Sequence, residues 1–396
     1  MTAAGSGSLS SSSVSLAAQV PLLDVNRGNA ALRDEILAAI AGVVDSGRFL
    51  FGPEVQQLER SVAEMCGVEH AIACASGSDA LLLALMALGI ADGDEVIVPS
   101  FTFFATASAV TRLGARPVFV DLDPRTFNID PQRIADAITP RTKAIIPVHL
   151  FGQCAEMDAI GDLAQRRRLF VIEDAAQAIG AKYWGRPACS LGAVGCLSFY
   201  PTKNLGAFGD GGMLTTSDAD LAQRLRLIAA HGMNPRYYHK VVGINSRLDT
   251  IQAAVLNVKL ARLGQWAEDR KTNARRYDEL LAKAGLDRHL VLPRAEPHCE
   301  HVWNQYTIRV KNGQRDAVKA QLAKAGVGSE VYYPVPLHLQ ECFGSLGYRP
   351  GSLPETERAA KEVLSLPIFP ELTAVEQHTV VARLREIFAR PLARAA

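Results

Sequence analysis

The chain has 396 residues and a formal net charge of +1, with 48% apolar and 21% charged residues. This length predicts two domains, or one large domain with an added lobe, and the near-zero charge gives no support for nucleic-acid binding. The longest wholly apolar run, residues 80–91, is too short to span a bilayer, so no membrane association is expected.

The N-terminal segment, residues 1–20, is rich in Ser and Ala and contains neither Lys nor Arg. A secretory signal begins with a cationic segment, so this composition indicates a flexible tail instead. The seven cysteines form no C-x-x-C pair and no cluster with histidine. Scattered thiols of this kind are typical of free cysteines in a reducing cytoplasm, and no metal site is expected.

A helical pattern over residues 29–49 ends at Asp45-Ser46-Gly47, and short apolar runs then alternate with longer helical patterns. Strands are predicted at 70–75, 95–100, 116–122, 143–150 and 169–176, and helices at 79–90, 104–115 and 157–167. Strands that are apolar throughout and separated by helices indicate an α/β fold with a mostly parallel sheet covered on both faces.

The pattern changes near residue 263, where a long charged helix begins. Segments 304–310, 314–326 and 328–335 follow, with fewer strands than before. We therefore expect a large domain over residues 21–262 and a smaller C-terminal α+β domain over 263–396.

One lysine, Lys203, lies in the glycine-rich stretch SFYPTKNLGAFGDGG, residues 198–212, with no other cation beside it. Some thirty residues earlier, Asp174 follows a buried strand, and ligands of parallel sheets bind beyond such strand ends. Pyridoxal 5′-phosphate (PLP) requires this pair, because a lysine forms a Schiff base with its aldehyde and an acid keeps its ring nitrogen protonated. The alternative is that Glu173 and Asp174 form a solvated turn.

Two further segments fit such a cofactor. In CASGSDALLLAL, Gly77 and Ser78 begin a helix directly after a strand, where backbone N–H groups favour a phosphate; the alternative is N-capping by Ser78 or Asp79. In PSFTFFATA, Phe103 could stack on a pyridine ring or belong to the core. Neither a P-loop nor a G-x-G-x-x-G fingerprint occurs in the first of these segments.

Six motifs, SGSDAL, PSFTFFAT, PVHLFGQ, IEDAAQ, SFYPTKNLGAFGDGG and GINSRLDTIQAAVL, occur in one order along the chain. In this order they resemble the PLP-dependent nucleotide-sugar aminotransferases of the DegT/DnrJ/StrS type. VYYPVPLHLQ and LSLPIFPELT near the C-terminus extend the resemblance to about residues 21–388. The resemblance implies the fold-type I architecture, in which a seven-stranded sheet lies between helices.

The resemblance also implies a role for individual residues. Lys203 would form the Schiff base and then move a proton between substrate and cofactor. Asp174 would pair with the ring nitrogen, and Gln177 would hydrogen-bond the phenolic oxygen. Gly77, Ser78 and Ser198 would hold the phosphate, and Phe103 would stack on the ring. Asn245 would reach the phosphate of the cofactor in a neighbouring subunit. The active unit would then be a homodimer with shared sites.

The substrate branch that the motifs resemble most acts on UDP-2-acetamido-2-deoxy-3-oxo-glucuronate, in surface polysaccharide biosynthesis. Arg247 would bind the sugar carboxylate, because a bidentate arginine suits a carboxylate. The C-terminal motifs would add Tyr332, Tyr333 and His338, although some uronate-specific relatives have histidine where this chain has Tyr332. A 3- or 4-oxo deoxyhexose on dTDP, UDP or GDP is the alternative. L-Glutamate would be the amino donor.

Rival functions leave different signatures. A sugar dehydratase on the same scaffold would have histidine at the position of Lys203, and a non-catalytic regulatory or binding protein would be expected to lose Lys203, Asp174 or Gln177. A nicotinamide dehydrogenase would need the missing glycine fingerprint. His149 could support the site or belong to the core, and Arg48 could contact the nucleotide or remain an exposed loop arginine.

Overall fold

The computed structural model describes residues 16–17 and 19–390. Its main sheet has seven strands in the order β1-β9-β8-β5-β4-β2-β3. In chain order these are β1 (His70–Cys74), β2 (Glu95–Pro99), β3 (Arg116–Val120), β4 (Thr142–Ile145), β5 (Phe170–Asp174), β8 (Val194–Ser198) and β9 (Gly212–Thr216). Only β9 runs antiparallel to its neighbours, so the predicted mostly parallel sheet is confirmed.

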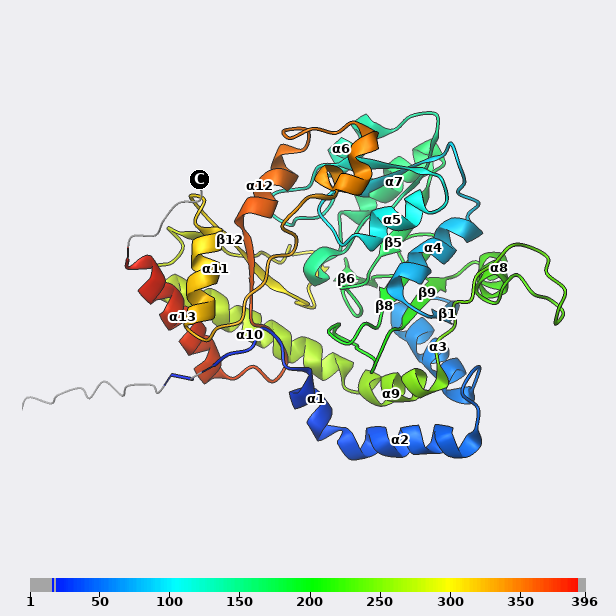
Figure 1. Cartoon of the computed structure of the whole chain (residues 1–396), viewed down its shortest axis with the longest axis horizontal. Coiled ribbons are helices and arrows are strands. Elements are labelled where there is room, and N and C mark those ends of the chain that lie inside the picture. The colour runs from blue at the N-terminus through cyan, green and yellow to red at the C-terminus, as the bar shows by residue number, and fades with distance from the viewer. Residues whose placement is uncertain (1–15, 18, 391–396) are drawn as a thin grey trace, which may run out of the picture.

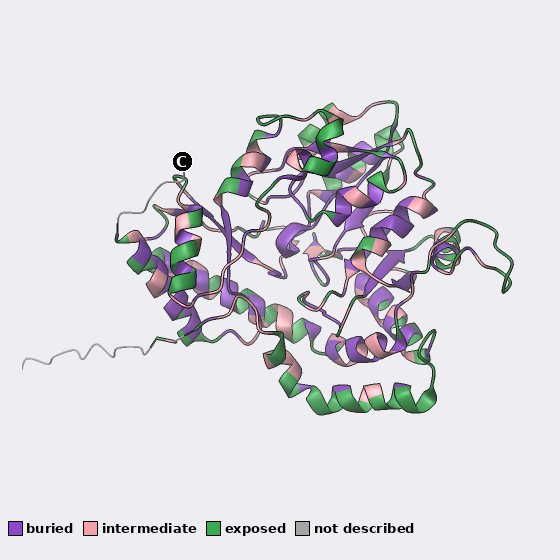
Figure 2. Ribbon diagram, viewed as in Figure 1, coloured by how far each residue is buried: buried purple, intermediate pink, exposed green. Residues whose placement is uncertain are grey.

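Helices cover both faces of this sheet (Figure 1). One face packs against α3 (Pro53–Cys66), α6 (Pro131–Ala137), α7 (Met157–Arg167) and α9 (Thr250–Leu260). The other packs against α4 (Gly77–Ala87), α5 (Ala105–Thr111) and α8 (Ala219–Ala229). Because apolar side chains point to both faces, the strands are buried almost throughout, as the purple strands of Figure 2 show. Outside them, α2 (Arg33–Ser46) packs on α9.

A smaller lobe lies beside the sheet and has its own core. It contains an antiparallel sheet of β10 (Leu290–Val291), β12 (Tyr306–Val310) and β13 (Val363–Leu366). Its helices are α1 (Val25–Ala31), α10 (Leu263–Lys283), α11 (Arg315–Lys324), α12 (Pro354–Glu362) and α13 (Ala374–Phe388). Residues 328–335 contribute only an isolated bridge between Glu330 and Ser365, not a regular strand.

The N-terminal segment belongs to this lobe. Most of the expected tail, residues 1–20, lies outside the described residues. Val20, at its end, is 1% exposed and pairs with Val327, and the Arg27 guanidinium binds the Glu376 carboxylate through two hydrogen bonds. The apolar side chain of Val20 is therefore part of the small-lobe core.

Two segments of the C-terminal half return to the large domain. β11 (Cys299–Glu300) pairs with β6 (Lys182–Tyr183), which also pairs with β7 (Arg186–Pro187). The 3₁₀ helices η2 (Leu337–Leu339) and η3 (Glu341–Leu346) carry Phe343 into the core under α4 and α5. The domain boundary at residue 263 stays a prediction.

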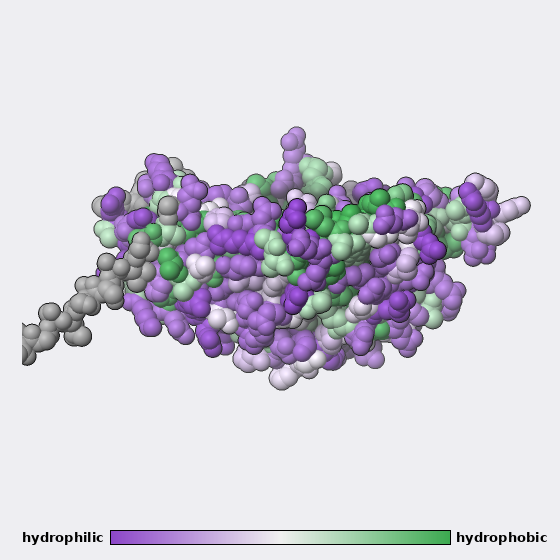
Figure 3. Space-filling model, turned by 90° about the horizontal axis from the view of Figure 1, so that it is seen from below, coloured by the Kyte–Doolittle hydropathy of each residue, from purple (hydrophilic) through white to green (hydrophobic). Residues whose placement is uncertain are grey.

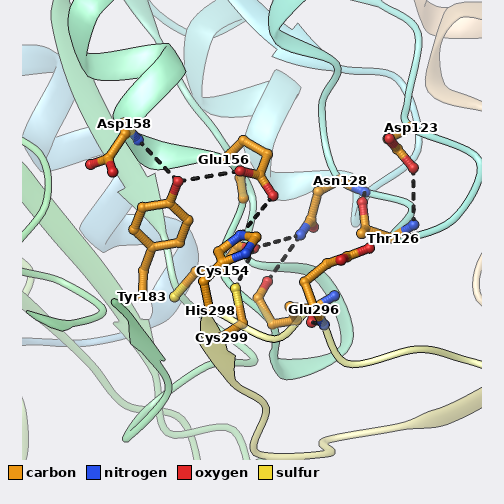
Figure 4. A network of polar contacts seen from close by, with 12 residues as sticks. Asp123, Thr126, Asn128, Cys154, Glu156, Asp158, Tyr183, Glu296, His298 and Cys299 are labelled. Atoms are coloured by element: carbon orange, nitrogen blue, oxygen red, sulfur yellow. Dashed lines mark hydrogen bonds and ion pairs between the residues drawn. The ribbon is translucent and has the colours of Figure 1, made fainter. Parts of the chain in front are cut away.

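A polar network fixes the first of these returning segments (Figure 4). The Glu156 carboxylate lies between His298, whose Nε2 is 2.9 Å from Oε1, and Tyr183, whose hydroxyl donates to Oε2 at 3.2 Å. The indole of Trp184 stacks on the His298 ring. These contacts attach the chain just before β11 to β6 and to the residue that precedes α7.

On the face seen from below, polar side chains cover most of the molecule and apolar ones gather in a band towards the upper edge (Figure 3). Among the described residues, no helix combines the length and the apolar character that crossing a bilayer requires. In the same part of the chain, no group of three or more His, Cys, Asp or Glu side chains is arranged to hold a metal ion. All seven cysteines are free thiols.

Candidate active site

The functional side chains predicted from sequence lie mainly at one edge of the sheet. β1, β2, β5 and β8 run in the same direction, so their carboxyl ends share that edge. Asp174 ends β5 and Ser198 ends β8, while α4 begins just after β1. Crossover connections bring these positions together from more than 100 residues of sequence, and this edge is where an α/β sheet binds ligands.

Asp174 is a buried carboxylate, 5% exposed, and is not part of a solvated turn. Its Oδ2 accepts a hydrogen bond of 2.7 Å from the hydroxyl of Thr106, and its Oδ1 accepts one of 3.2 Å from the backbone N–H of Ala176. Burial raises the pKa of Asp174, while these two hydrogen bonds and the charge of Lys203 oppose the rise. A carboxylate has further lone pairs, so Asp174 can still accept a hydrogen bond from a cationic ligand.

Glu173 is buried as well, but its carboxylate serves the scaffold. Successive strand residues point to opposite faces, and Glu173 accepts hydrogen bonds from the backbone N–H groups of Cys189, Leu191 and Gly192 at 2.7–2.8 Å. His149, fully buried, lies 2.9 Å from the same carboxylate, and its Nδ1 accepts from Ala155 N–H. Because both ring nitrogens of His149 are engaged, this histidine belongs to the core.

Lys203 lies in the loop that joins β8 to β9. The loop is compact: Lys203 N–H donates to the carbonyl of Tyr200, and a Cβ added to Gly206 would lie 2.3 Å from the carbonyl oxygen of Pro201. Asn204 attaches the loop to the carbonyl of Val302, and the Lys259 ammonium donates to the carbonyl of Gly206. The tight glycine turn therefore orients one lysine and holds it there.

Burial lowers the pKa of the Lys203 amine, and the negative charge of Asp174 partly offsets this effect. A lowered pKa increases the fraction of neutral amine, which is the form that attacks a carbonyl carbon. The two groups predicted from sequence to act together thus influence each other electrostatically in the folded chain.

Tyr333 lies near Asp174, and both Gln177 and Phe103 lie next to Tyr333. The Gln177 carboxamide accepts from Phe151 N–H at 2.7 Å, and its Nε2 lies 3.4 Å from the Tyr333 hydroxyl. Burial raises the pKa of Tyr333, and the nearby charge of Asp174 adds to the rise. Phe103 is 58% exposed, and its ring centroid lies 6.4 Å from that of Tyr333, so its ring is available for stacking and is not part of the core.

The start of α4 forms a cradle with the end of β8. A Cβ added to Gly77 would lie 2.6 Å from the Cβ of Ser198, so only glycine allows this approach. Ser76, not Ser78 or Asp79, is the N-cap: its backbone is extended, and its hydroxyl accepts from Asp79 N–H at 3.1 Å. The N–H groups of Gly77 and Ser78, in the first turn, have no helical carbonyl partner and are free for an anion.

Asn245 and Arg247 lie on a segment anchored beside this cradle, because the hydroxyl of the buried Ser246 between them accepts from Ala75 N–H at 3.1 Å. Asn245 is exposed, and the Arg247 guanidinium lies 5.7 Å from the centre of the Phe51 ring. Pairing of residues 50 and 249 also brings the loop of Arg48 alongside, with Arg48 exposed.

His338 and Tyr332 are placed differently from each other. Tyr332 is half-buried against Tyr333. His338 is 2% exposed, with Nδ1 2.7 Å from the hydroxyl of Ser100 and Nε2 3.2 Å from the carboxylate of Glu357. Burial lowers the pKa of His338. Both ring nitrogens of His338 therefore have protein partners, and this buried ring has no free nitrogen for a substrate.

The donor set at this edge fits PLP. It combines a lysine with a lowered pKa, a buried carboxylate with free lone pairs, an exposed aromatic ring and a helix N-terminus that can hold a phosphate. A parallel α/β sheet with these groups beyond its strand ends defines a lysine-dependent PLP enzyme. Residues 30–385 match the model of the DegT/DnrJ/EryC1/StrS aminotransferase family, and the chain belongs to this family. It is a PLP-dependent aminotransferase.

Three curated relatives are similar over nearly their whole length. A pleiotropic regulatory protein of Geobacillus stearothermophilus is 51% identical over 93% of this chain and 98% of its own. A UDP-N-acetyl-3-dehydro-α-D-glucosamine 3-aminotransferase of Acidithiobacillus ferrooxidans is 48% identical, over 94% and 98%. A UDP-2-acetamido-2-deoxy-3-oxo-D-glucuronate aminotransferase of Pseudomonas aeruginosa is 45% identical, over 92% and 99%.

Among solved structures, DesV of S. venezuelae in complex with a ketimine intermediate superposes with a TM-score of 0.91. It is 45% identical and matches 95% of this chain and 100% of its own. The fold-type I architecture expected from sequence is therefore confirmed.

Proposed function

We propose that this aminotransferase moves an amino group from L-glutamate to the oxo carbon of a nucleotide-linked amino sugar. The observation that carries the proposal is the placement of Lys203 and the buried Asp174 at one edge of the sheet, near enough to influence each other's charge, in a chain 45–48% identical to aminotransferases named for 3-oxo UDP-sugars. The relative described as a regulatory protein does not favour a non-catalytic role here, because Lys203, Asp174 and Gln177 are all present.

The side chains divide the tasks of the proposed reaction among them. PLP supplies an electron sink that stabilises negative charge on the carbon losing its proton. Asp174 would hold the proton on the ring nitrogen, and Gln177 would hydrogen-bond the phenolic oxygen. Lys203 would bind the cofactor and, within each half of the cycle, move one proton between the substrate carbon and the cofactor carbon that carries the nitrogen. Gly77, Ser78 and Ser198 bind the phosphate, and Phe103 stacks on the ring.

For the sugar, we propose UDP-2-acetamido-2-deoxy-3-oxo-glucuronate as the substrate, in the synthesis of a surface polysaccharide. Arg247 is the residue proposed to bind the sugar carboxylate, with Tyr332 and Tyr333 beside the sugar. Two features support Arg247: it is half-exposed, and no described carboxylate forms an ion pair with it. The competing substrate is the corresponding sugar without the carboxylate, because the Acidithiobacillus ferrooxidans relative named for that sugar is 48% identical to this chain.

We further propose a homodimer in the cytoplasm. Asn245 is exposed, so its carboxamide is free to contact a neighbouring subunit, which supports the expectation that it reaches that subunit's cofactor. The seven free thiols support a reducing compartment.

Absorption spectroscopy tests the proposed half-reaction. Purified protein with PLP is expected to show a visible band from the lysine-bound cofactor, and L-glutamate should convert it to the shorter-wavelength band of the amine form. A band that ignores glutamate would exclude this donor but retain the cofactor site. Absence of a visible band would contradict the role of Lys203.

Replacing Arg247 by methionine tests the sugar. Methionine keeps the apolar stem but removes the guanidinium, so kcat/KM for the 3-oxo uronate should fall about 10²-fold, as expected when a charged hydrogen-bond partner is lost. The half-reaction with glutamate should remain within about twofold. Activity on the sugar without a carboxylate is the internal control. Equal losses on both sugars would contradict carboxylate recognition by Arg247.

A further inference from the structure

Two buried threonines lead to the carboxylate of Asp174. Thr106, in the first turn of α5, is 0% exposed, and its hydroxyl lies 2.7 Å from Oδ2 of Asp174. Thr102, in the loop before α5, is 2% exposed, and its hydroxyl lies 3.2 Å from that of Thr106. The three side chains form a short line from the loop after β2 to the end of β5.

The direction of these hydrogen bonds follows from their chemistry. An ionised carboxylate only accepts, so the Thr106 hydroxyl must donate its single proton to Asp174. The oxygen of Thr106 can then accept the proton of Thr102. Hydrogen bonds aligned in one direction polarise one another, and away from water this strengthens the final bond to the carboxylate.

The hydroxyl of Thr106 is exceptional on its helix. Helical threonine and serine commonly donate to a carbonyl one turn back. Thr111 does so, with its hydroxyl 3.2 Å from the carbonyl of Ala107, and Ser108 does so with Ala105. Thr106 instead donates across the domain to a residue 68 positions away.

The same turn also holds Phe103. The backbone N–H of Thr106 donates to the carbonyl of Phe103 at 3.3 Å. The ring proposed to stack on the cofactor and the hydroxyl that binds Asp174 are therefore only three residues apart in one rigid turn. A shift of this turn would move the aromatic ring and the partner of Asp174 together.

We propose that Thr106, supported by Thr102, is a positioning residue that keeps Asp174 ionised and oriented towards the ring nitrogen of PLP. The inference rests on the proposed cofactor site. Thr106 does not touch the reacting atoms but acts through Asp174. Its hydroxyl orients one carboxylate oxygen, the N–H of Ala176 orients the other, and the remaining lone pairs face the ligand.

The test is a pH titration of the visible band in Thr106→Val, Thr106→Ser and Thr111→Val, each loaded with PLP. Valine keeps the shape of threonine but lacks the hydroxyl, so the ionised form of Asp174 is less stable. Asp174 then keeps the ring nitrogen of PLP protonated less effectively. With less positive charge on the ring, the Nζ of Lys203 that is bonded to the cofactor becomes more basic. Its apparent pKa should rise by about 0.5 to 1 unit in Thr106→Val. PLP should also dissociate about tenfold more readily.

Thr106→Ser should titrate like the wild type, because serine restores the donor. Thr111→Val is the matched control: it removes a hydroxyl from the same helix without touching Asp174, and should also titrate like the wild type. Thr102→Val should shift the pKa in the same direction but less, and it decides the question if Thr106→Val does not fold.

Two failures are distinguishable. A wild-type protein that shows no visible band with PLP would overturn the proposed function, and the inference with it. A wild-type protein that binds and titrates PLP, with unchanged titration in Thr106→Val, would overturn the inference alone. The same holds if Thr106→Val fails to fold and Thr102→Val titrates like the wild type.

Discussion

Lys203→Ala is expected to abolish covalent attachment of PLP and to reduce turnover by at least about 10³-fold. The amine acts both as nucleophile and as the base that moves the proton, and alanine can do neither. The fold should survive, because the backbone hydrogen bond from Lys203 to Tyr200 does not need the side chain. Removing a buried amine also removes its desolvation cost.

Borohydride reduction followed by peptide mass spectrometry measures the attachment directly. The wild type should carry the modification on Lys203, and Lys203→Ala should carry none. Lys143→Ala, which changes an exposed lysine on β4, should behave like the wild type. A Lys203→Ala protein that still turns over sugar substrate would contradict the assignment of the catalytic lysine.

Asp174→Asn is expected to lower kcat/KM by about 10²- to 10⁴-fold. The neutral amide cannot stabilise a protonated ring nitrogen, and breaking a buried charge pair costs about 3–5 kcal/mol. The loss should appear in both half-reactions, because the ring must accept electrons in each. Single-turnover absorption measurements with glutamate would resolve the first half-reaction from the second.

Glu173→Gln provides the matched comparison on the same strand. Its carboxylate binds three backbone N–H groups and His149 and does not face the ligand edge. We expect an unfolding free energy lower by about 2–3 kcal/mol, with kcat/KM within about tenfold of wild type. If Glu173→Gln lost activity while Asp174→Asn kept it, the roles of the two carboxylates would be reversed.

The sequence predicts five of the seven strands, β1 to β5, and it predicts that Lys203 and Asp174 act together; β8 and β9, on either side of the Lys203 loop, are not among the predicted strands. Apolar runs of five residues separated by helices leave few arrangements, and strand ends in such a sheet meet at one edge. It does not distinguish Ser76 from Ser78 or Asp79 as the cap of α4, because both serine and aspartate cap helices and only the extended backbone of Ser76 decides.

Other features carried no sequence signal. β6 and β11 have two residues each, too few to show any periodicity, so the return of the chain to the large domain was not predicted. Thr106 resembles any small residue in an alanine-rich helix. Its role depends on a contact with a residue 68 positions away, which no local pattern records. His338, by contrast, lies in a recognisable motif, but its burial between Ser100 and Glu357 is a tertiary property.

The contact between the N-terminal segment and the small lobe has a consequence for synthesis on the ribosome. Arg27 can bind Glu376 only after 349 more residues have been synthesised, and at ordinary translation rates this synthesis takes about 17 to 70 s. All strands of the large sheet have been made by residue 216 and can assemble well before then. Residues 20–27 therefore lack their partners while most of the chain is made. A protease added to ribosome-bound nascent chains should cut within residues 20–27 until translation is nearly complete.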